Sequence, residues 1–180
     1  CIAKTADYAP VIMSSYISVS QRVNGQVGVV GLMTKGASQG STRNSAWFEF
    51  TGTDNTKLQC KSSLNSNEEV TNVTLPGGYT TGQMLRYRVE LSHEYVQFQI
   101  NGVVVATHYN MVPDPYAVVN LFIGWINTSG PSSSSDIVVD TVFISNANII
   151  QVQSGFTGIP FRVESTPTEK LAQTSASALN

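Results

Sequence analysis

Residues 85–107, LRYRVELSHEYVQFQINGVVVAT, constrain the fold of this chain more than any other stretch. Every second residue of the first part is apolar, as in a half-buried strand: Leu85, Tyr87, Val89 and Leu91. A second strand follows with the same alternation: Val96, Phe98 and Ile100. Asn101-Gly102 then favours a tight hairpin turn, in which both central residues need positive φ. The stretch therefore predicts an antiparallel β protein.

Short strand-like runs separated by turn clusters continue along most of the chain. They lie at 11–20, 26–34, 46–51, 56–61, 69–75, 117–127 and 136–145, with a weaker run near 148–153. No window has the spacing of an amphipathic helix, so we expect almost no helix. This pattern predicts a two-sheet sandwich or jelly roll. The expected core is Tyr16, Val29, Leu32, Trp47, either Phe48 or Phe50, Leu58, Leu85, Tyr87, Val89, Val96, Phe98, Ile100, Leu121, Ile123, Trp125, Val142 and Ile144.

Two strings resemble a known family. YRVELSHEYVQFQINGVVVATH, at 87–108, and DIVVDTVFIS, at 136–145, are similar to the hairpin and late strand of concanavalin A-like jelly rolls. That superfamily includes laminin G-type domains, legume lectins and many bacteriophage head and tail appendages. The resemblance covers roughly 11–150, and its motifs are structural, so it indicates fold rather than activity. It implies an all-β, antiparallel two-sheet β-sandwich, which we place at 1–153. The composition of residues 154–180 predicts that an extended C-terminal arm follows.

Composition narrows the choice of partners. Only 12% of the residues are charged, the net charge is -2, and the ten Lys and Arg residues are scattered. Nucleic acid is therefore excluded as a partner, because phosphate binding needs clustered cations. No apolar run approaches the roughly 20 residues that span a membrane. Cys1 and Cys60 are too few for a disulfide framework or a metal site, and Cys1 fits either a lipid-modified terminus or a processed chain.

The arm at 154–180 differs from the rest of the chain. Its candidate anchors are Phe161, Val163 and Leu171, and its end consists largely of Ser, Thr and Ala. Such a segment buries too little apolar surface to offset its own ordering entropy. We therefore expect a neighbouring protein subunit to hold it, in a homo-oligomer, a capsid or a tail. The alternative is that the arm lies across its own domain.

Catalytic patterns are weak. The glucanase branch of the superfamily has acids in a pattern like E-x-D-x-x-E, which this sequence lacks. The nearest acids are Glu49 and Asp54, five residues apart across an expected turn, while Glu68-Glu69 point apart in a strand. His93 and His108 have no nucleophile elbow and no third zinc ligand. We therefore expect no catalytic residue and no enzymatic activity.

Calcium is the one cofactor that the resemblance suggests, since laminin G-type and lectin members bind it through loop oxygens. Asp114, in the loop at 111–116, and Asp136, after the Ser-rich loop, are the candidate ligands. Asp114 lies between two prolines and is equally suited to forming a turn, and Asp136 equally to starting a strand. Otherwise no cofactor is expected.

Glycan binding is suggested by aromatic and amide side chains in or near loops: Tyr79, Tyr109, Tyr116 and Asn127. Tyrosine rings can stack on sugar faces, but the same rings can pack a loop down or contact another subunit.

Three functions follow from these patterns. The first is a non-enzymatic virion protein that decorates a bacteriophage capsid or forms part of an appendage, anchored by its arm and located at the virion surface or outside the cell. The second is a carbohydrate-binding module that uses its loop aromatics. The third is a glycoside hydrolase with an unfamiliar acid pair that includes Glu49.

Overall fold

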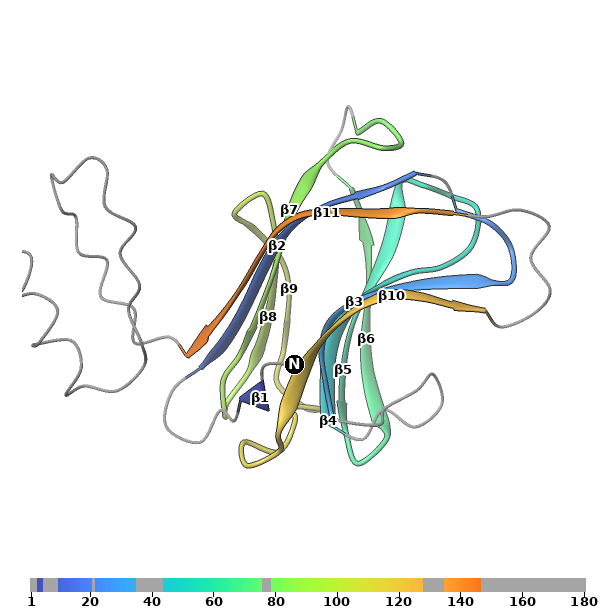
Figure 1. Cartoon of the computed structure of the whole chain (residues 1–180). Helices are drawn as coiled ribbons and strands as arrows, with labels where there is room; N and C mark the ends of the chain where they lie inside the picture. Colours follow the sequence, from blue (N-terminus) through green and yellow to red (C-terminus); the bar gives the residue numbers. More distant parts are fainter. Residues whose placement is uncertain are drawn as a thin grey trace, which may run out of the picture.

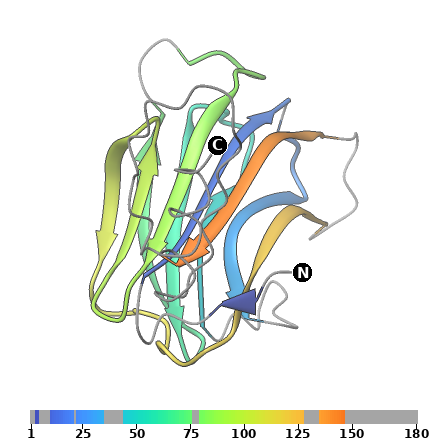
Figure 2. The ribbon, with the colours of Figure 1, turned by 60° about the vertical axis from the view of Figure 1, so that its left-hand side comes forward.

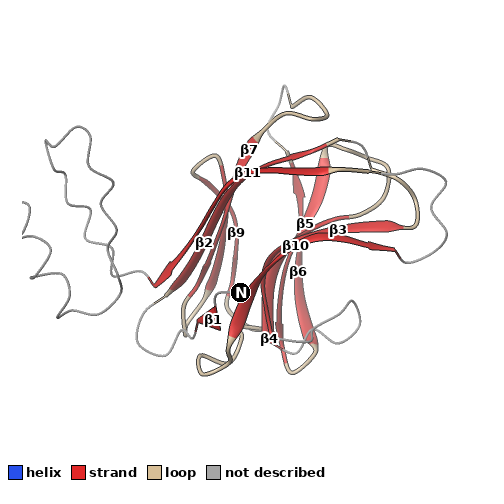
Figure 3. Cartoon of the chain, in the orientation of Figure 1, coloured by secondary structure: helices blue, strands red, loops and turns tan. Residues whose placement is uncertain are grey.

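The computed structural model describes residues 3–4, 10–20, 22–34, 44–75, 79–127 and 135–146. Cys1, the run at 148–153 and the predicted arm, with Phe161, Val163 and Leu171, lie outside the described residues. The described part contains strands and no helix (Figure 3). In chain order the strands are β1 (Ala3–Lys4), β2 (Val11–Val19), β3 (Gln26–Thr34), β4 (Asn44–Phe50), β5 (Lys57–Leu64), β6 (Asn67–Thr74), β7 (Leu85–Leu91), β8 (Val96–Ile100), β9 (Val103–His108), β10 (Val119–Asn127) and β11 (Ile137–Asn146).

These strands form two antiparallel sheets packed face to face (Figure 1). Sheet A has the order β1-β10-β3-β4-β5-β6, and sheet B has the order β11-β2-β7-β8-β9. In Figure 1, β3 and β10 bend toward the outer side of sheet A, so this outer face is concave there. The two-sheet jelly roll confirms the predicted fold class. Among the described residues, none forms a helix long and apolar enough to cross a membrane.

The hairpin that dominates the sequence forms as predicted. Ile100 pairs with Val103, so Asn101 and Gly102 alone make the turn, with φ values of 51° and 83°. The Asn101 Oδ1 also accepts a 2.8 Å hydrogen bond from the Arg86 backbone N–H of the neighbouring strand. The turn therefore fixes the register of β7, β8 and β9 together.

A second tight turn, between β5 and β6, was absent from the sequence prediction. Asn65 and Ser66 have φ values of 51° and 70°, and Leu64 pairs with Asn67 on either side of them. The prediction ended one strand at 61 and began the next at 69, whereas β5 and β6 both continue to this turn. Asn tolerates positive φ, so Asn65 is the signal that could have located the hairpin.

The main core lies between the sheets and is centred on aromatic rings. Phe48 packs edge to face against Tyr87 and Phe98, with ring centroids 5.1 Å and 5.3 Å apart. Phe50 packs against Tyr87 in the same way, so both phenylalanines point inward rather than one of them. Edge-to-face pairs add to the burial energy of the rings.

Four predicted core residues lie elsewhere. Trp47 and Val29 belong to a second apolar cluster, on the outer side of sheet A. Tyr16 is exposed, because on β2 it shares the outer parity of Ser14 and Ser18 and not that of Met13 and Ile17. Val142 is exposed because β11 is an edge strand.

Candidate functional site

The outer face of sheet A brings together polar and aromatic side chains from β4, β5 and β6. Strand β4 alternates, so Ala46, Phe48 and Phe50 enter the core while Ser45, Trp47 and Glu49 point the other way. The register across the sheet places Lys61 beside Trp47 and Gln59 beside Glu49. On β6, Val70 lies next to Lys61, and Asn72 next to Gln59. Residues far apart in sequence therefore share one surface.

Glu49 is the centre of this surface and is only 7% exposed. Its Oε2 accepts a 3.1 Å hydrogen bond from the Trp47 indole N–H, and its Oε1 lies 2.9 Å from the Lys61 Nζ. The same ammonium group lies 6.0 Å from the centroid of the Trp47 ring. A buried carboxylate needs such partners, because an unpaired charge would be costly to desolvate.

A second carboxylate joins the cluster through the same lysine. The Glu68 Oε2 lies 3.7 Å from the Lys61 Nζ, which is 2.9 Å from Glu49. The two carboxylate oxygens are therefore no farther apart than the sum of these distances. That limit admits the carboxyl spacing of about 5.5 Å found in retaining glycosidases. Neither Glu49 with Asp54 nor Glu68 with Glu69 is the pair that converges.

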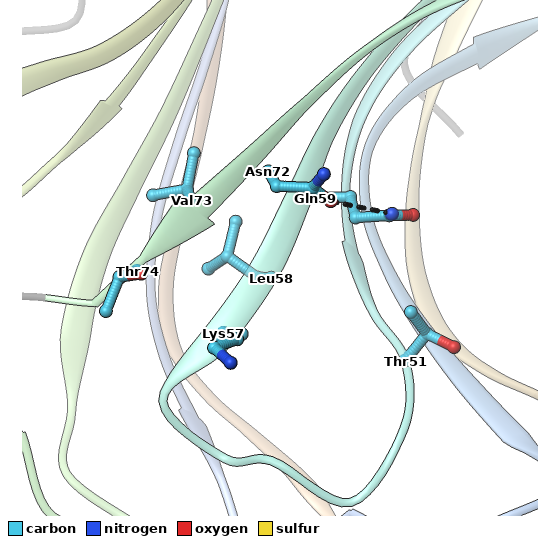
Figure 4. A pocket seen from close by; sticks show the side chains of 7 residues that line it. All are labelled: Thr51, Lys57, Leu58, Gln59, Asn72, Val73 and Thr74. Carbon is cyan, nitrogen blue, oxygen red and sulfur yellow. Dashed lines mark hydrogen bonds between the residues drawn. The ribbon is translucent and has the colours of Figure 1, made fainter.

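A hollow of about 380 Å³ lies along β5 and β6 (Figure 4). One of its lining residues, Gln59, pairs with Glu49 across the sheet. Its wall includes an amide pair, in which the Gln59 Nε2 donates a 2.9 Å hydrogen bond to the Asn72 Oδ1. The remaining lining residues are Thr51, Lys57, Leu58, Val73 and Thr74. Amides and hydroxyls around a hollow can donate and accept hydrogen bonds in the pattern that a polyhydroxylated ligand requires.

One wall of the hollow is held in place by Arg22, which precedes β3. The Arg22 guanidinium donates hydrogen bonds to the backbone carbonyls of Asp54, Asn55 and Lys57. It also lies over the Phe50 ring, with the Cζ 5.3 Å from the centroid. Burial lowers the pKa of Arg22. Five donors on a planar group suit it to gathering several carbonyls, so it fixes the β4–β5 loop.

Asp54 serves this same loop. Its Oδ1 accepts hydrogen bonds from the Thr56 hydroxyl and backbone N–H, which hold the pKa of Asp54 at about 2. Its other oxygen lies 3.2 Å from the Lys57 Nζ. Asp54 is therefore a structural turn residue and is not a partner of Glu49.

The β3 side of the outer face is apolar. Met33 and Val27 lie there with Trp47, and Phe122 and Ile126 of β10 pack against them. Gly31 permits the approach of Trp47, because a Cβ at this position would lie 2.5 Å from the Trp47 Cα. The outer face of sheet A therefore combines an apolar floor with a charged and amide-rich half.

The tyrosines predicted to bind glycan do not share one environment. Tyr79 is half-buried against the main core, where burial raises its pKa. Tyr109 and Tyr116 are 69% and 74% exposed, at the two ends of the β9–β10 connection. Asn127 ends β10 opposite Gln26, and its side chain is outside the described set. The glycan role of all four stays a prediction.

Two polar side chains hold the β9–β10 connection. The Glu69 Oε2 accepts hydrogen bonds from the backbone N–H groups of Asn110 and Met111, and the Asn44 Oδ1 accepts one from Asp114. Partial burial raises the pKa of Glu69, but the hydrogen bonds from Asn110 and Met111 help to bring it below its ordinary value. Tyr109 and Tyr116 therefore lie in a connection that these hydrogen bonds hold in place.

The candidate calcium ligands lie apart. Asp114 precedes β10, where its Oδ1 accepts a 2.9 Å hydrogen bond from the Tyr116 backbone N–H. Asp136 follows β10 and is bonded through its backbone to Ser20. Within the ranges that the structure describes, no three His, Cys, Asp or Glu side chains are grouped to hold a metal. Calcium binding stays a prediction.

His108 has a role that its sequence position does not indicate. Buried between the sheets, its Nδ1 lies 2.8 Å from the Ser62 Oγ and its Nε2 lies 3.0 Å from the Thr71 Oγ1. The ring also packs edge to face against Phe98. Burial lowers the pKa of His108. The residue joins β9 of sheet B to β5 and β6 of sheet A, whereas His93 is exposed beside Glu94.

Solved structures with the same fold include enzymes and a binding module. The catalytic domain of an endo-1,3-β-glucanase (laminarinase) from Thermotoga petrophila RKU-1 matches with a TM-score of 0.61 and 10% identity, over 82% of this chain and 66% of that one. A Bacillus licheniformis β-glucanase matches with a TM-score of 0.55 and 18% identity, over 71% and 56%. Carbohydrate-binding module CBM66 from Bacillus subtilis matches with a TM-score of 0.51 and 11% identity, over 77% and 76%.

These similarities establish the concanavalin A-like jelly-roll fold and no more, because the identities are low. The chain spans little more than half the length of the B. licheniformis protein. No protein-family model matches the sequence, and no curated protein is significantly similar to it.

The prediction that this chain is not an enzyme is wrong, since β-glucanases are among the structures that it resembles. The absence of E-x-D-x-x-E from one strand was too narrow a criterion, because carboxylates can also converge from separate strands. The virion role, the arm's partner and the location stay predictions, since the arm lies outside the described residues.

Proposed function

We propose that the outer face of sheet A binds a β-linked glucan chain. The observation that supports this most directly is the solvent-accessible Gln59–Asn72 amide pair in the wall of the hollow, beside the Glu49–Lys61 ion pair. Amide, hydroxyl and ammonium groups there can donate to and accept from sugar hydroxyls, and Phe122 and Ile126, which are only partly buried on the same outer face, suit the less polar faces of the rings. The likeness to glucanases and to a carbohydrate-binding module adds support for this ligand class.

The binding proposal is tested by titrating the protein with β-1,3-glucan and with mixed-linkage β-1,3-1,4-glucan oligosaccharides in a calorimeter. Asn72→Ala and Gln59→Ala should each weaken binding about tenfold, the effect of one lost set of hydrogen bonds. Sheet B offers a matched control, since the Gln99 Nε2 donates to the Gln97 Oε1 on its outer side at 2.7 Å. Gln97→Ala should leave affinity unchanged. Equal losses in both sheets, or no binding by the wild-type chain, would overturn the proposal.

Hydrolysis of the bound glucan is a second candidate, and it rests on the shared contact of Glu49 and Glu68 with Lys61. In such a reaction one carboxyl group protonates the leaving glycosidic oxygen. The other attacks the anomeric carbon or removes a proton from the attacking water. Lys61 would have to move aside from the pair for a sugar to enter between them.

Release of reducing ends from the same glucans measures this activity. Glu49→Gln and Glu68→Gln should each abolish release, while Glu49→Gln, which keeps the size of the side chain, should still bind the glucan. Release that survives both substitutions, or binding with no release by the wild-type chain, would remove hydrolysis and leave the binding proposal standing.

A further inference from the structure

Strand β11 lies at one edge of sheet B among the described strands. Within the described residues it pairs only with β2 and forms the edge of the sheet, where it is drawn in orange (Figure 2). Val138 and Phe143 are 53% and 45% exposed, and Val139 and Val142 are exposed beside them. An edge strand presents unpaired backbone N–H and C=O groups, so exposed apolar side chains on it favour pairing with another strand.

The sequence of β11 is self-complementary. From 137 to 144 it reads IVVDTVFI, with three apolar residues on each side of two central polar ones. An antiparallel pair of such strands related by a twofold axis would place Ile137 opposite Ile144 of the partner subunit. The same register sets Val138 opposite the partner's Phe143 and Val139 opposite the partner's Val142. Every apolar residue therefore meets an apolar residue.

In this register, residues that lie opposite each other in the two copies also point to the same face of the joined sheet. Val138 and Phe143 pair with Ser18 and Ser14 of β2, which point to the outer face, while Val139 and Val142 pair with Ile17 and Ser15, which point inward. Opposite residues of an antiparallel pair lie on one face, so outer meets outer and inner meets inner. The irregularity between Val139 and Val142 falls at the twofold centre and interrupts neither apolar triplet.

The centre of the register is polar, and no charged residue lies directly opposite a residue of the same charge. Asp140 would lie opposite Thr141 of the partner subunit, whose hydroxyl can donate to its carboxylate. Two of the other edges among the described strands are less suited to pairing with themselves. Strand β6 has Glu68 and Glu69 near one end, and β9 would set Val103 opposite His108. We propose that two copies of this chain associate through β11, joining their B sheets into one continuous sheet.

The oligomeric state of the full chain tests this proposal by sedimentation equilibrium over a wide concentration range. Thr141→Asp puts a second carboxylate opposite Asp140 of the partner subunit, at both symmetry-related positions. It should raise the dimer dissociation constant at least about tenfold. Thr141→Lys, at the same exposed site, should keep or strengthen the dimer through Asp140. A wild-type monomer throughout, or a dimer that Thr141→Asp leaves intact, would overturn the proposal.

Register is tested by cross-linking in a Cys1→Ser background, with the buried Cys60 retained. A Val138→Cys protein mixed with a Phe143→Cys protein should form an intermolecular disulfide on oxidation, because opposite residues of an antiparallel pair meet the Cα spacing that a disulfide needs. Neither variant alone should form this disulfide. Equal cross-linking of the single variants, or loss of the dimer on Val103→Asp at the β9 edge, would show that another surface associates.

Discussion

The outer faces of the two sheets contain the same kinds of side chains in different arrangements. Each has an ion pair and an amide pair: Lys61–Glu49 with Gln59–Asn72 on sheet A, where Lys61 also lies near Glu68, and Arg88–Glu90 with Gln97–Gln99 on sheet B. On sheet B the partners are two residues apart on one strand. On sheet A they come from three strands, and Glu49 and Lys61 also contact the Trp47 indole.

The difference lies in what holds each group. The sheet B pairs are local contacts that any alternating strand can form. The sheet A cluster exists only because three strands pair in one register, so the fold itself positions a second carboxylate beside the first. Convergence of this kind, at residues partly removed from water, is typical of binding and catalytic sites.

The largest expected effect is on stability when the strand-crossing lysine is removed. Lys61→Met leaves the buried Glu49 with only the Trp47 indole N–H as a partner, and should lower the free energy of unfolding by about 3 kcal/mol. Arg88→Met should cost about 1 kcal/mol, since Glu90 keeps a 2.6 Å hydrogen bond from the Tyr95 hydroxyl. Urea unfolding measures both. Equal losses of unfolding free energy in Lys61→Met and Arg88→Met would contradict the proposed difference between the outer faces of the two sheets.

A smaller, pH-dependent effect is expected at His108, which ties the two sheets together. Because burial lowers its pKa, the unfolded chain binds a proton more readily than the folded one. Stability should therefore be full above pH ~6.5 and decline as the pH falls below it, by at most about 1.4 kcal/mol per pH unit. Unfolding between pH 7 and ~5.5 avoids the carboxylate range.

His108→Gln should flatten this pH profile, whereas His93→Gln, at an exposed site, should leave it unchanged. A slope that persists in His108→Gln would assign the pH dependence to other groups.

The smallest expected effect is confined to one side chain of sheet B. The hydrogen bond to Glu90, with some desolvation, raises the pKa of Tyr95 to about 12. Glu90→Gln removes the charge, so the pKa should fall toward the ordinary ~10 of tyrosine. Spectrophotometric titration of the phenols follows this change. A Tyr95 that still titrates near its original pH would mean that Glu90 is not its partner.

The sequence was sufficient wherever a local pattern decided the structure. Asn101-Gly102, the alternation of β7 and β8 and the late strand at 136–145 led to the correct fold class. It failed at Trp47 because both parities of β4 contain apolar residues, so alternation alone cannot say which side faces the core. At Tyr16 it failed because one aromatic residue was predicted to be buried although Ser14 and Ser18 share its parity.

The candidate site depended on register and could not be predicted in the same way. Glu49, Lys61 and Glu68 are separated along the chain, and only the pairing of β4, β5 and β6 brings them together. His108 gave no signal either, since its partners Ser62 and Thr71 belong to the opposite sheet.

Arg22 has a consequence for how the molecule opens. By bonding the carbonyls of Asp54, Asn55 and Lys57, it ties the segment before β3 to the loop between β4 and β5. Separating either segment from the body breaks the whole set of bonds at once. This loop therefore belongs to the same cooperative unit as the central strands, and the wall of the hollow beside it is preformed rather than assembled when a ligand arrives.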